Sequence, residues 1–374
     1  MRIGIPAETS AGENRVAATP ETVKKMLVAG HSVMVQQGAG AGSNFLDIDY
    51  QAAGATLVGV EEVFSRAEIV LKVRAPTKDE LAKLSVNSVL IGLLLPFQAD
   101  LVAAYAKQGI VAFSMERLPR TSRAQAMDVL SSQANIAGYK AMLVAANLYK
   151  QFIPMLMTAA GTVKAARVLV LGVGVAGLQA IATAKRMGAV IEASDVRPAV
   201  KEQVESLGAK FVDVPYETDE EREIAQGVGG YARSMPEAWM QRQKIELAKR
   251  VMHADIVITT ALIPGRVAPV LITEEMVKSM KTGSVVVDLA IEAGGNCPLS
   301  ELDKIVVKHG VTLVGESNLP ALVAKDASSL YARNLLNFVN LLCDPSGGGK
   351  INIDRTDDII SESMLCINGE VISK

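Results

Sequence analysis

The chain has 374 residues, enough for two or three domains, and its 49% hydrophobic and 21% charged residues predict large buried cores rather than disorder. Its formal net charge of −2, without a basic tail or patch, argues against a nucleic-acid partner. The three cysteines, Cys297, Cys343 and Cys366, lie far apart without metal-ligand spacing, which indicates a reducing compartment and no structural zinc. We expect a soluble chain, because the start lacks a targeting pattern and the apolar run 168–184 is divided by three glycines.

The first third of the chain predicts a parallel sheet wrapped by helices. Thr19, Pro20 and Glu21 are typical of a helix start, and Gly30 ends that helix. A glycine-rich stretch at 37–43 is not followed by a clean helix and an acid-ended strand, so we do not predict a nucleotide site there. Alternating strands and helices make this domain Rossmann-like without the fingerprint, with strands expected at 2–6, 32–35, 68–73, 88–95 and 110–114.

The pattern changes at Thr121, and an alanine-rich, helix-like stretch from Ser122 to Tyr149 is expected to bridge two domains. Four polar residues, Arg120, Gln125, Asp128 and Ser131, gather near its start. The last three are spaced by three positions, so they could share one face. Spacing alone leaves two interpretations open, a functional cluster or a helix cap with solvated polar residues.

The strongest motif of the chain is Gly172-Val-Gly174-Val-Ala-Gly177. A predicted buried strand at 168–171 precedes it, and a predicted helix at 178–187 follows, ended by Gly188. This is the dinucleotide fingerprint in its required context of strand, tight turn and helix. Gly172 permits the turn, Gly174 lets a pyrophosphate approach the backbone, and Gly177 lets helix and strand pack closely. The helix N-terminus would offer N–H groups to the phosphates.

An acid ends the next predicted strand, at 190–193. Asp195 lies 23 residues after Gly172, close to the spacing of about 20 at which a carboxylate accepts hydrogen bonds from a ribose. Its charge favours NAD over NADP, because a 2′-phosphate beside it would meet repulsion. Arg197 is either a ligand or lid on the pyrophosphate side or a solvated charge before Pro198.

The rest of the chain completes this second domain. A charged insertion at 216–242, with Gly230 and Tyr231 near its tip, is either a mobile flap over the cofactor or a variable surface loop. Predicted strands at 255–261 and 284–289 should end at the cleft. A last helix at 325–342 is expected to return to the first domain, and Asn368-Gly369 predicts a hairpin turn.

The predicted fold class is therefore α/β, with two Rossmann-like, doubly wound, parallel-sheet domains joined by long helices and a cleft between them. We expect residues 1–133 with 325–374 to form a Rossmann-like N-terminal domain. Residues 134–324 are expected to form the NAD(H)-binding domain.

A proton-transferring group is missing from this picture. Dehydrogenases of hydroxy and amino acids need a general acid or base, most often His or Lys. The only histidines, His31, His253 and His309, each fall where a helix pattern stops and a strand begins. Arg15 and Lys72 could hold a substrate carboxylate but also suit surface salt bridges. Hydride exchange between two nicotinamides needs no proton transfer, only two rings held face to face in a dry cleft.

Several segments resemble the NAD(H)-binding component (alpha subunit, domain I) of the proton-translocating NAD(P) transhydrogenases, which are related to alanine dehydrogenases. The resemblance covers nearly the whole chain and rests on Glu13-Asn-Arg15-Val-Ala, on 120–133, on Met157-Thr-Ala-Ala-Gly-Thr, on 172–186, on Thr260-Ala-Leu262-Ile-Pro-Gly and on 288–300.

The resemblance implies a dimer that binds NADH and transfers hydride, with Si-face/Re-face specificity, to NADP⁺ on a separate NADP(H)-binding component. It also implies docking on a membrane-spanning, proton-conducting component, hence a cytoplasmic place on the inner face of the plasma membrane. It assigns the nicotinamide end to Arg120, Gln125, Asp128 and Ser131, the pyrophosphate to Val175, Ala176 and Gly177, the adenosine side to Asp195, Val196 and Arg197, the flap to Gly230, Tyr231 and Gln243, and the cofactor groove to Leu262.

Two alternatives remain open. An alanine dehydrogenase would carry Arg15 and Lys72 for pyruvate, but 93–97 has no His where that family has one, and Glu292 stands where it has Asp. A non-catalytic, NAD-sensing module would bind NADH without hydride exchange.

Overall fold

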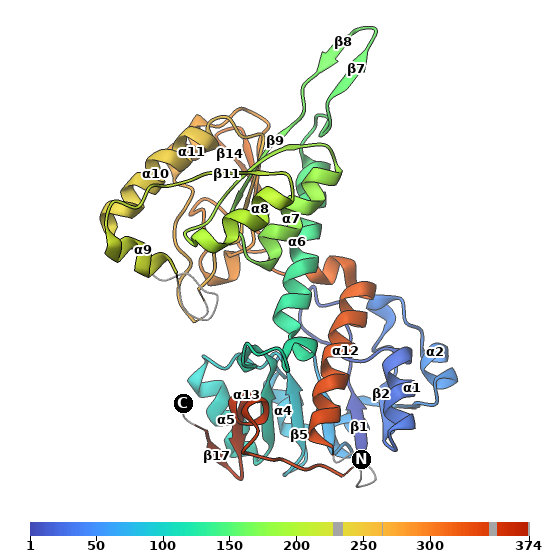
Figure 1. Ribbon diagram of the computed structural model, residues 1–374. Helices are drawn as coiled ribbons and strands as arrows, with labels where there is room; N and C mark the ends of the chain where they lie inside the picture. The colour runs from blue at the N-terminus through green and yellow to red at the C-terminus, as the bar shows by residue number, and fades with distance from the viewer. Residues whose placement is uncertain (227–234, 264, 344–349, 373–374) are drawn as a thin grey trace. The chain divides into compact units, whose positions relative to one another are not determined.

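The computed structural model describes residues 1–226, 235–263, 265–343 and 350–372, and the chain divides into two compact units. Unit 1 comprises Met1–Gln133 and Pro320–Lys374, and unit 2 comprises Ala134–Leu319. Each unit holds a mostly parallel sheet with helices packed on it (Figure 1). The predicted α/β class with two Rossmann-like sheets is confirmed.

The sheet of unit 1 has the strand order β17-β16-β6-β5-β4-β1-β2-β3. Strands β1 to β6 are parallel, while β16 and β17 add an antiparallel hairpin at one edge. Asn368 and Gly369 both have positive φ in the hairpin turn, so the turn predicted there is confirmed. The strands are β1 (Arg2–Ile5), β2 (Ser32–Gln36), β3 (Thr56–Val58), β4 (Ile69–Leu71), β5 (Val89–Gly92), β6 (Val111–Ser114), β16 (Met364–Ile367) and β17 (Glu370–Val371).

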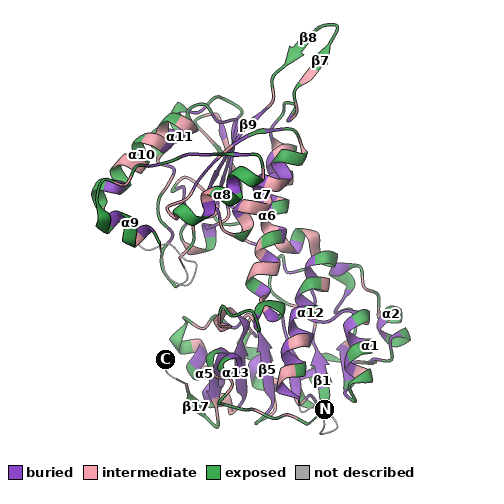
Figure 2. Cartoon of the chain, viewed as in Figure 1, coloured by how far each residue is buried: buried purple, intermediate pink, exposed green. Residues whose placement is uncertain are grey.

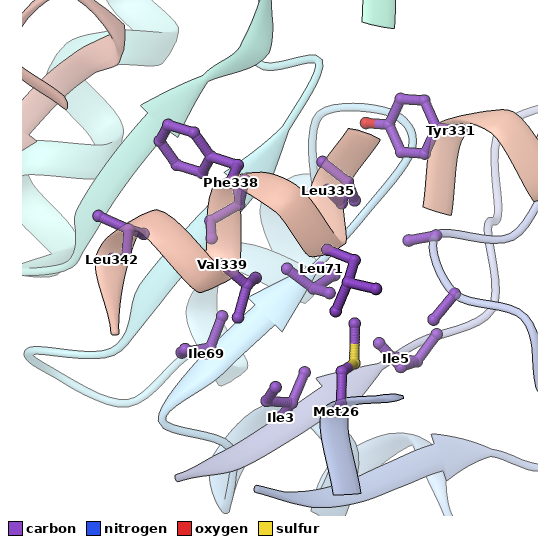
Figure 3. Packing of buried hydrophobic residues seen from close by; sticks show 14 of the residues in the cluster. Ile3, Ile5, Met26, Ile69, Leu71, Tyr331, Leu335, Phe338, Val339 and Leu342 are labelled. Carbon is purple, nitrogen blue, oxygen red and sulfur yellow. The ribbon is translucent and has the colours of Figure 1, made fainter. Parts of the chain in front are cut away.

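Both faces of this sheet are covered, which explains why its strands are apolar at successive positions. Ile69 and Leu71 of β4 face one core with α1 (Pro20–Val28) and α12 (Ala324–Leu342), as Figure 3 shows for α12. Val70, between them, faces a second core with α3 (Val60–Ser65), α4 (Lys78–Lys83) and α5 (Ala99–Gln108). The short helices α2 (Asp47–Ala52) and α13 (Asp358–Ser363) also belong to unit 1.

The sheet of unit 2 has the order β11-β10-β9-β12-β13-β15-β14, and only β14 is antiparallel to its neighbour among these described strands. The strands are β9 (Arg167–Leu171), β10 (Val190–Ser194), β11 (Lys210–Phe211), β12 (Ile256–Thr259), β13 (Val285–Asp288), β14 (Ile305–Lys308) and β15 (Val311–Val314). One face packs on α6 (Val129–Leu148), α7 (Val175–Arg186) and α8 (Lys201–Ser206), and the other on α10 (Glu237–Val251) and α11 (Glu274–Ser279). Helix α9 (Asp219–Ala225) packs in a smaller cluster.

The two sheets share one topology. In each, six parallel strands, β1 to β6 in unit 1 and β9 to β13 with β15 in unit 2, follow the order 3-2-1-4-5-6 when numbered along the chain, which is the order of doubly wound dinucleotide-binding folds. The order reverses between β1 and β4 in unit 1 and between β9 and β12 in unit 2. Ligands of such sheets bind at the carboxyl ends of the strands at this switch point.

Three features differ from the sequence-based expectations. The helix expected from residue 122 begins at Val129, after a 3-10 turn at Gln125–Met127. His309 lies in the tight turn between β14 and β15 rather than after a helix; its φ of 53° and that of 76° at Gly310 suit a two-residue hairpin turn. The third feature, a hairpin of β7 (Leu156–Thr158) and β8 (Gly161–Val163), extends from the body of unit 2 and is largely exposed (Figure 2).

No helix in the described parts of the chain is both long and apolar enough to span a bilayer. The described residues also contain no group of three or more His, Cys, Asp or Glu side chains suited to a metal ion.

Candidate dinucleotide-binding site

The glycine turn of the fingerprint joins β9 to α7 at the switch point of unit 2. Gly172 has a φ of 89°, in the left-handed region that glycine enters without strain. A Cβ on Gly177 would lie 2.1 Å from the carbonyl oxygen of Gly172, closer than any real contact. The turn geometry itself therefore requires both glycines.

Gly174 differs, because no contact among the described residues requires it to be glycine. Its φ is −83°, and an added Cβ would meet no atom of these residues within 4 Å. It is also the N-cap of α7, and it gives that helix no side-chain cap. By contrast, Thr19, Thr218 and Thr273 cap α1, α9 and α11.

Val175, Ala176 and Gly177 form the uncapped first turn of α7. The N–H groups of a first turn have no intrahelical acceptor. Together with the helix dipole they suit an anion placed in the open space beside Gly174. The residues present therefore fit the pyrophosphate of a dinucleotide.

Asp195, at the end of β10, carries the second element of the site. Its carboxylate accepts a hydrogen bond from the N–H of Val173 at 2.7 Å, which ties the strand end to the glycine turn. The Arg197 guanidinium donates to the same carboxylate from Nε at 2.9 Å and from Nη2 at 2.8 Å. This pairing raises the pKa of Arg197. The interpretation of Arg197 as a solvated charge is wrong, since its side chain is 19% exposed. Val196 lies between the two and accepts a bond from the Tyr216 hydroxyl at 2.8 Å.

The segment after β12 forms the third side of the site. The Thr260 hydroxyl donates to the carbonyl of Gly172 at 2.7 Å. Asn296, fully buried, accepts from the Ala261 N–H at 3.1 Å and donates to its carbonyl at 2.9 Å. Leu262, which follows Ala261 in the chain, is 49% exposed. This exposure agrees with a side chain that lines a groove.

Sequence reasoning missed Thr260 and Asn296 as parts of this site. Their bonds join positions 88 and 35 residues apart, to backbone atoms, so no local spacing reveals them. Behind them, the buried Asp288 carboxylate accepts from Thr259, from the Ala290 N–H and from the Cys297 N–H. Asp288 thereby fixes the loop that carries Asn296.

The four polar residues predicted for the nicotinamide end lie in unit 1. The Asp128 carboxylate accepts from the Ser131 N–H at 2.9 Å and from its hydroxyl at 2.5 Å, which caps the start of α6. Gln125 begins the 3-10 turn before it and is exposed, as is Arg120. The cap interpretation of the spacing is therefore confirmed for Asp128 and Ser131, and it leaves a ligand-binding role open for the loop.

Only part of the predicted flap lies among the described residues. Gly230 and Tyr231 lie outside the described residues. Gln243 lies on α10, which begins at Glu237, within the stretch 216–242 that the sequence predicts to be an insertion. Beside it, Arg242 binds the Glu221 carboxylate through both oxygens, at 2.6 and 2.7 Å, and so joins α10 to α9.

All three histidines lie at the wrong edges of their sheets for catalysis at the strand carboxyl ends. His31 precedes β2 and His253 precedes β12, while His309 lies in the turn that leads into β15. These positions are the amino ends of strands in parallel sheets, and in unit 2 they lie opposite the edge where Gly172 and Thr260 lie. Neither His253 nor His309 can therefore serve as an acid or base beside the glycine turn.

Family models match nearly the whole chain: "Alanine dehydrogenase/PNT, N-terminal domain" over residues 4–137 and "Alanine dehydrogenase/PNT, C-terminal domain" over residues 141–374. The chain is 54% identical over 381 residues to a Rhodospirillum rubrum protein, the first part of its NAD(P) transhydrogenase subunit alpha, covering 100% of this chain and 98% of that protein. A crystal structure of transhydrogenase from Sinorhizobium meliloti superposes with a TM-score of 0.88 at 43% identity, covering all of both chains. A structure of L-alanine dehydrogenase gives a TM-score of 0.82 at 26% identity, covering 100% of this chain and 97% of the other. This protein is a member of the alanine dehydrogenase/PNT family.

Proposed function

We propose that this chain is the NAD(H)-binding component of a proton-translocating NAD(P) transhydrogenase. It would transfer hydride between NADH bound in unit 2 and NADP⁺ bound on a partner component. The observation that carries the proposal is the open space beside Gly174 at the uncapped start of α7, with Asp195 hydrogen-bonded to the same turn. The transhydrogenase relatives are also more similar to this chain than the alanine dehydrogenase structure is.

When bound, NADH supplies the hydride; the protein's residues bind and orient it. The first-turn N–H groups of Val175, Ala176 and Gly177 bind the pyrophosphate. Asp195 accepts hydrogen bonds from the adenosine ribose, and Arg197, paired with it, keeps the carboxylate oriented. The Asp128–Ser131 cap and Gln125 position the nicotinamide carboxamide and do not react with it.

This role needs no proton-transferring residue, which agrees with the placement of the histidines. The coupled proton movement would occur in the membrane-spanning component. The Si-face/Re-face specificity implied by the resemblance would follow from the orientation in which the loop holds the ring. Docking on those components would hold the chain at the inner face of the plasma membrane.

A homodimer is part of the proposal, and the β7–β8 hairpin supports it. An isolated two-stranded hairpin is marginally stable in water. Here Met155 and Met157 are 58% and 77% exposed, and Val163 is 37% exposed. A second copy would cover these apolar side chains. Sedimentation equilibrium should find a dimer, and deletion of residues 156–163 should shift it to monomer.

The experiment that tests the function pairs the purified chain with an NADP-binding transhydrogenase component. We expect NADH-dependent reduction of bound NADP⁺, and no such reduction by either component alone. Failure with a partner known to be active with another NAD(H)-binding component would count against the proposal.

An alanine-type dehydrogenase is the second candidate, and the residues that favour it are Arg15 and Lys72. The structure buries both among carboxylates of the chain itself. Arg15 binds Glu13 from Nε at 2.7 Å and from Nη2 at 2.6 Å. Lys72 lies 3.3 Å from carboxylate oxygens of Glu8 and Glu80. Oxidation of NADH that depends on pyruvate and ammonium, by the chain alone, would establish this candidate. A non-catalytic sensor would instead bind NADH and stay inert under every pairing.

A further inference from the structure

We infer that Asn334, on α12, is a positioning residue for the loop that carries Gln125, Asp128 and Ser131. The inference rests on the proposed function, in which this loop holds the nicotinamide end of NADH. Asn334 does not touch the coenzyme in this account; it acts through the backbone of the loop.

The contacts of Asn334 bracket the functional part of the loop. Its Nδ2 donates to the carbonyl oxygen of Ala126 at 2.9 Å, and its Oδ1 lies 2.8 Å from the hydroxyl of Ser132. A carbonyl can only accept, so this bond requires the amide nitrogen on the Ala126 side. Asp128 and Ser131 lie between these two anchor points in the chain. One buried amide thus sets the distance between the ends of the segment that forms the cap.

Helix α12, which carries the Asn334 amide, is fixed by packing in the core of unit 1. Tyr331, Leu335, Phe338 and Leu342 are buried at helical spacing and face the sheet of unit 1 (Figure 3). Asn334 lies among them at 9% exposure, so its position is set by the core.

A neighbouring residue supports the same anchor. The side chain of Asn337, one turn further along α12, donates to the carbonyl of Ala126 at 3.0 Å. Two amides from one helix therefore bind one loop oxygen. The backbone hydrogen bonds that form α12 do not need the amides of Asn334 and Asn337. Both amides instead hold the loop at Ala126.

The replacement Asn334→Asp tests the inference with a chemical switch. At neutral pH the introduced carboxylate would face the Ala126 carbonyl as a second acceptor, so the loop would lose the Asn334 anchor and keep only the bond from Asn337. Burial raises the pKa of such a carboxyl, and its protonated form can donate to Ala126 as the amide does. The anchor should therefore return as the pH falls below that pKa and be lost as the pH rises through it.

We expect hydride transfer to the NADP-binding component, at saturating NADH, to fall about 10- to 100-fold at neutral pH, because small misplacements cost that much. The rate should recover on acidification, relative to the wild type at the same pH. The dissociation constant for NADH, from calorimetry, should change less than about threefold, because the pyrophosphate turn is untouched. Asn334→Ala should lower the rate at every pH without the recovery.

The matched control is Asn340→Asp, the same change at an exposed position of the same helix. It should keep the wild-type rate and pH profile. A wild-type rate and profile for Asn334→Asp would overturn the inference, as would a loss of NADH affinity that parallels the loss of rate. If the wild type itself transfers no hydride, the proposed function fails instead. Hydrogen exchange at the Met127 and Asp128 amides then still decides whether Asn334 holds the loop, since Asn334→Asp should speed it at neutral pH only.

Discussion

The two units share one strand order, but they use its switch point in opposite ways. In unit 2 the chain leaves β9 through a glycine turn with open space beside Gly174. In unit 1 the segments after β1 and β4 fill the equivalent place with Glu8 and Lys72, whose side chains are 2% and 1% exposed. The same crevice is the proposed coenzyme site in one unit and holds a buried ion cluster in the other.

The glycines of the two units differ in the same way. The stretch at 37–43 follows β2, away from the switch point. A Cβ on Gly40 would lie 2.7 Å from the ring of Tyr50, and the N–H of Gly38 already donates to Asp47 at 2.9 Å. Gly40 serves close packing and Gly38 a left-handed turn with a φ of 77°, whereas Gly174 borders space that no described residue fills. The two units therefore cannot be told apart by their fold or their glycine content. They differ in whether side chains fill the switch point.

Breaking the ion cluster of unit 1 should give the largest effect on stability. Lys72→Met leaves Glu8 and Glu80 without their cation, which typically costs about 3–5 kcal/mol. Burial already raises the pKa of Glu8, and loss of Lys72 would raise it further. A carboxyl with a raised folded-state pKa favours folding at low pH, so the deficit should shrink on acidification. Urea unfolding at several pH values measures this.

The control is Lys25→Met, which breaks the exposed pair with Glu21 and should cost at most about 1 kcal/mol. Calorimetry should show unchanged NADH affinity in both variants. Loss of affinity in Lys72→Met alone, with the fold intact, would contradict the division of roles between the units.

Two glycine replacements sharpen the other half of the comparison. Gly177→Ala forces a Cβ against the Gly172 carbonyl and should destabilise the protein by about 3 kcal/mol and abolish NADH binding. Gly174→Ala should cost under about 1 kcal/mol of stability, as at other N-caps, yet weaken NADH binding about 100-fold. Thermal unfolding and calorimetry separate the two. Equal affinity in Gly174→Ala and the wild type would mean that nothing binds in that space.

Asp195→Ala removes the carboxylate that Arg197 and the Val173 N–H share. NADH affinity should fall about 30-fold, since a charge-assisted hydrogen bond is worth roughly 1.5–3 kcal/mol. Discrimination against NADPH should narrow, because the freed guanidinium favours a 2′-phosphate. Titrations with both coenzymes provide the measurement, and unchanged affinities would remove Asp195 from the site.

Asp128→Asn should give the smallest change in stability, because Asn caps a helix as well as Asp does. Hydride transfer should nevertheless slow by about tenfold, or about 1.4 kcal/mol, while NADH affinity changes less. Single-turnover kinetics with the partner component measures the rate. An unaffected rate would show that the Asp128–Ser131 cap only starts α6.

The sequence predicts the features that depend on residues close together in the chain, and it misses those that depend on contacts between distant residues. The fingerprint, the Asp195 spacing and the Asn368–Gly369 turn are local patterns, and the structure has each element there. The start of α6 lies later than the sequence predicts, because alanine-rich sequence favours helix on both sides of the cap at Asp128. The β7–β8 hairpin escapes prediction, since exposed strands lack the apolar alternation that marks buried ones. Asn296 and Asn334 escape it too, because amide-to-backbone bonds across long stretches of chain leave no periodic signal.

The most direct test of the central claim follows one hydrogen atom. The chain, the NADP-binding component and NADP⁺ would be mixed with NADH that carries deuterium at both C4 positions, and the NADPH formed would be analysed by mass spectrometry. Direct transfer between two nicotinamides predicts one deuterium in every NADPH, with none lost to water. NADPH without deuterium, or deuterium found in alanine when pyruvate and ammonium are present, would contradict the account.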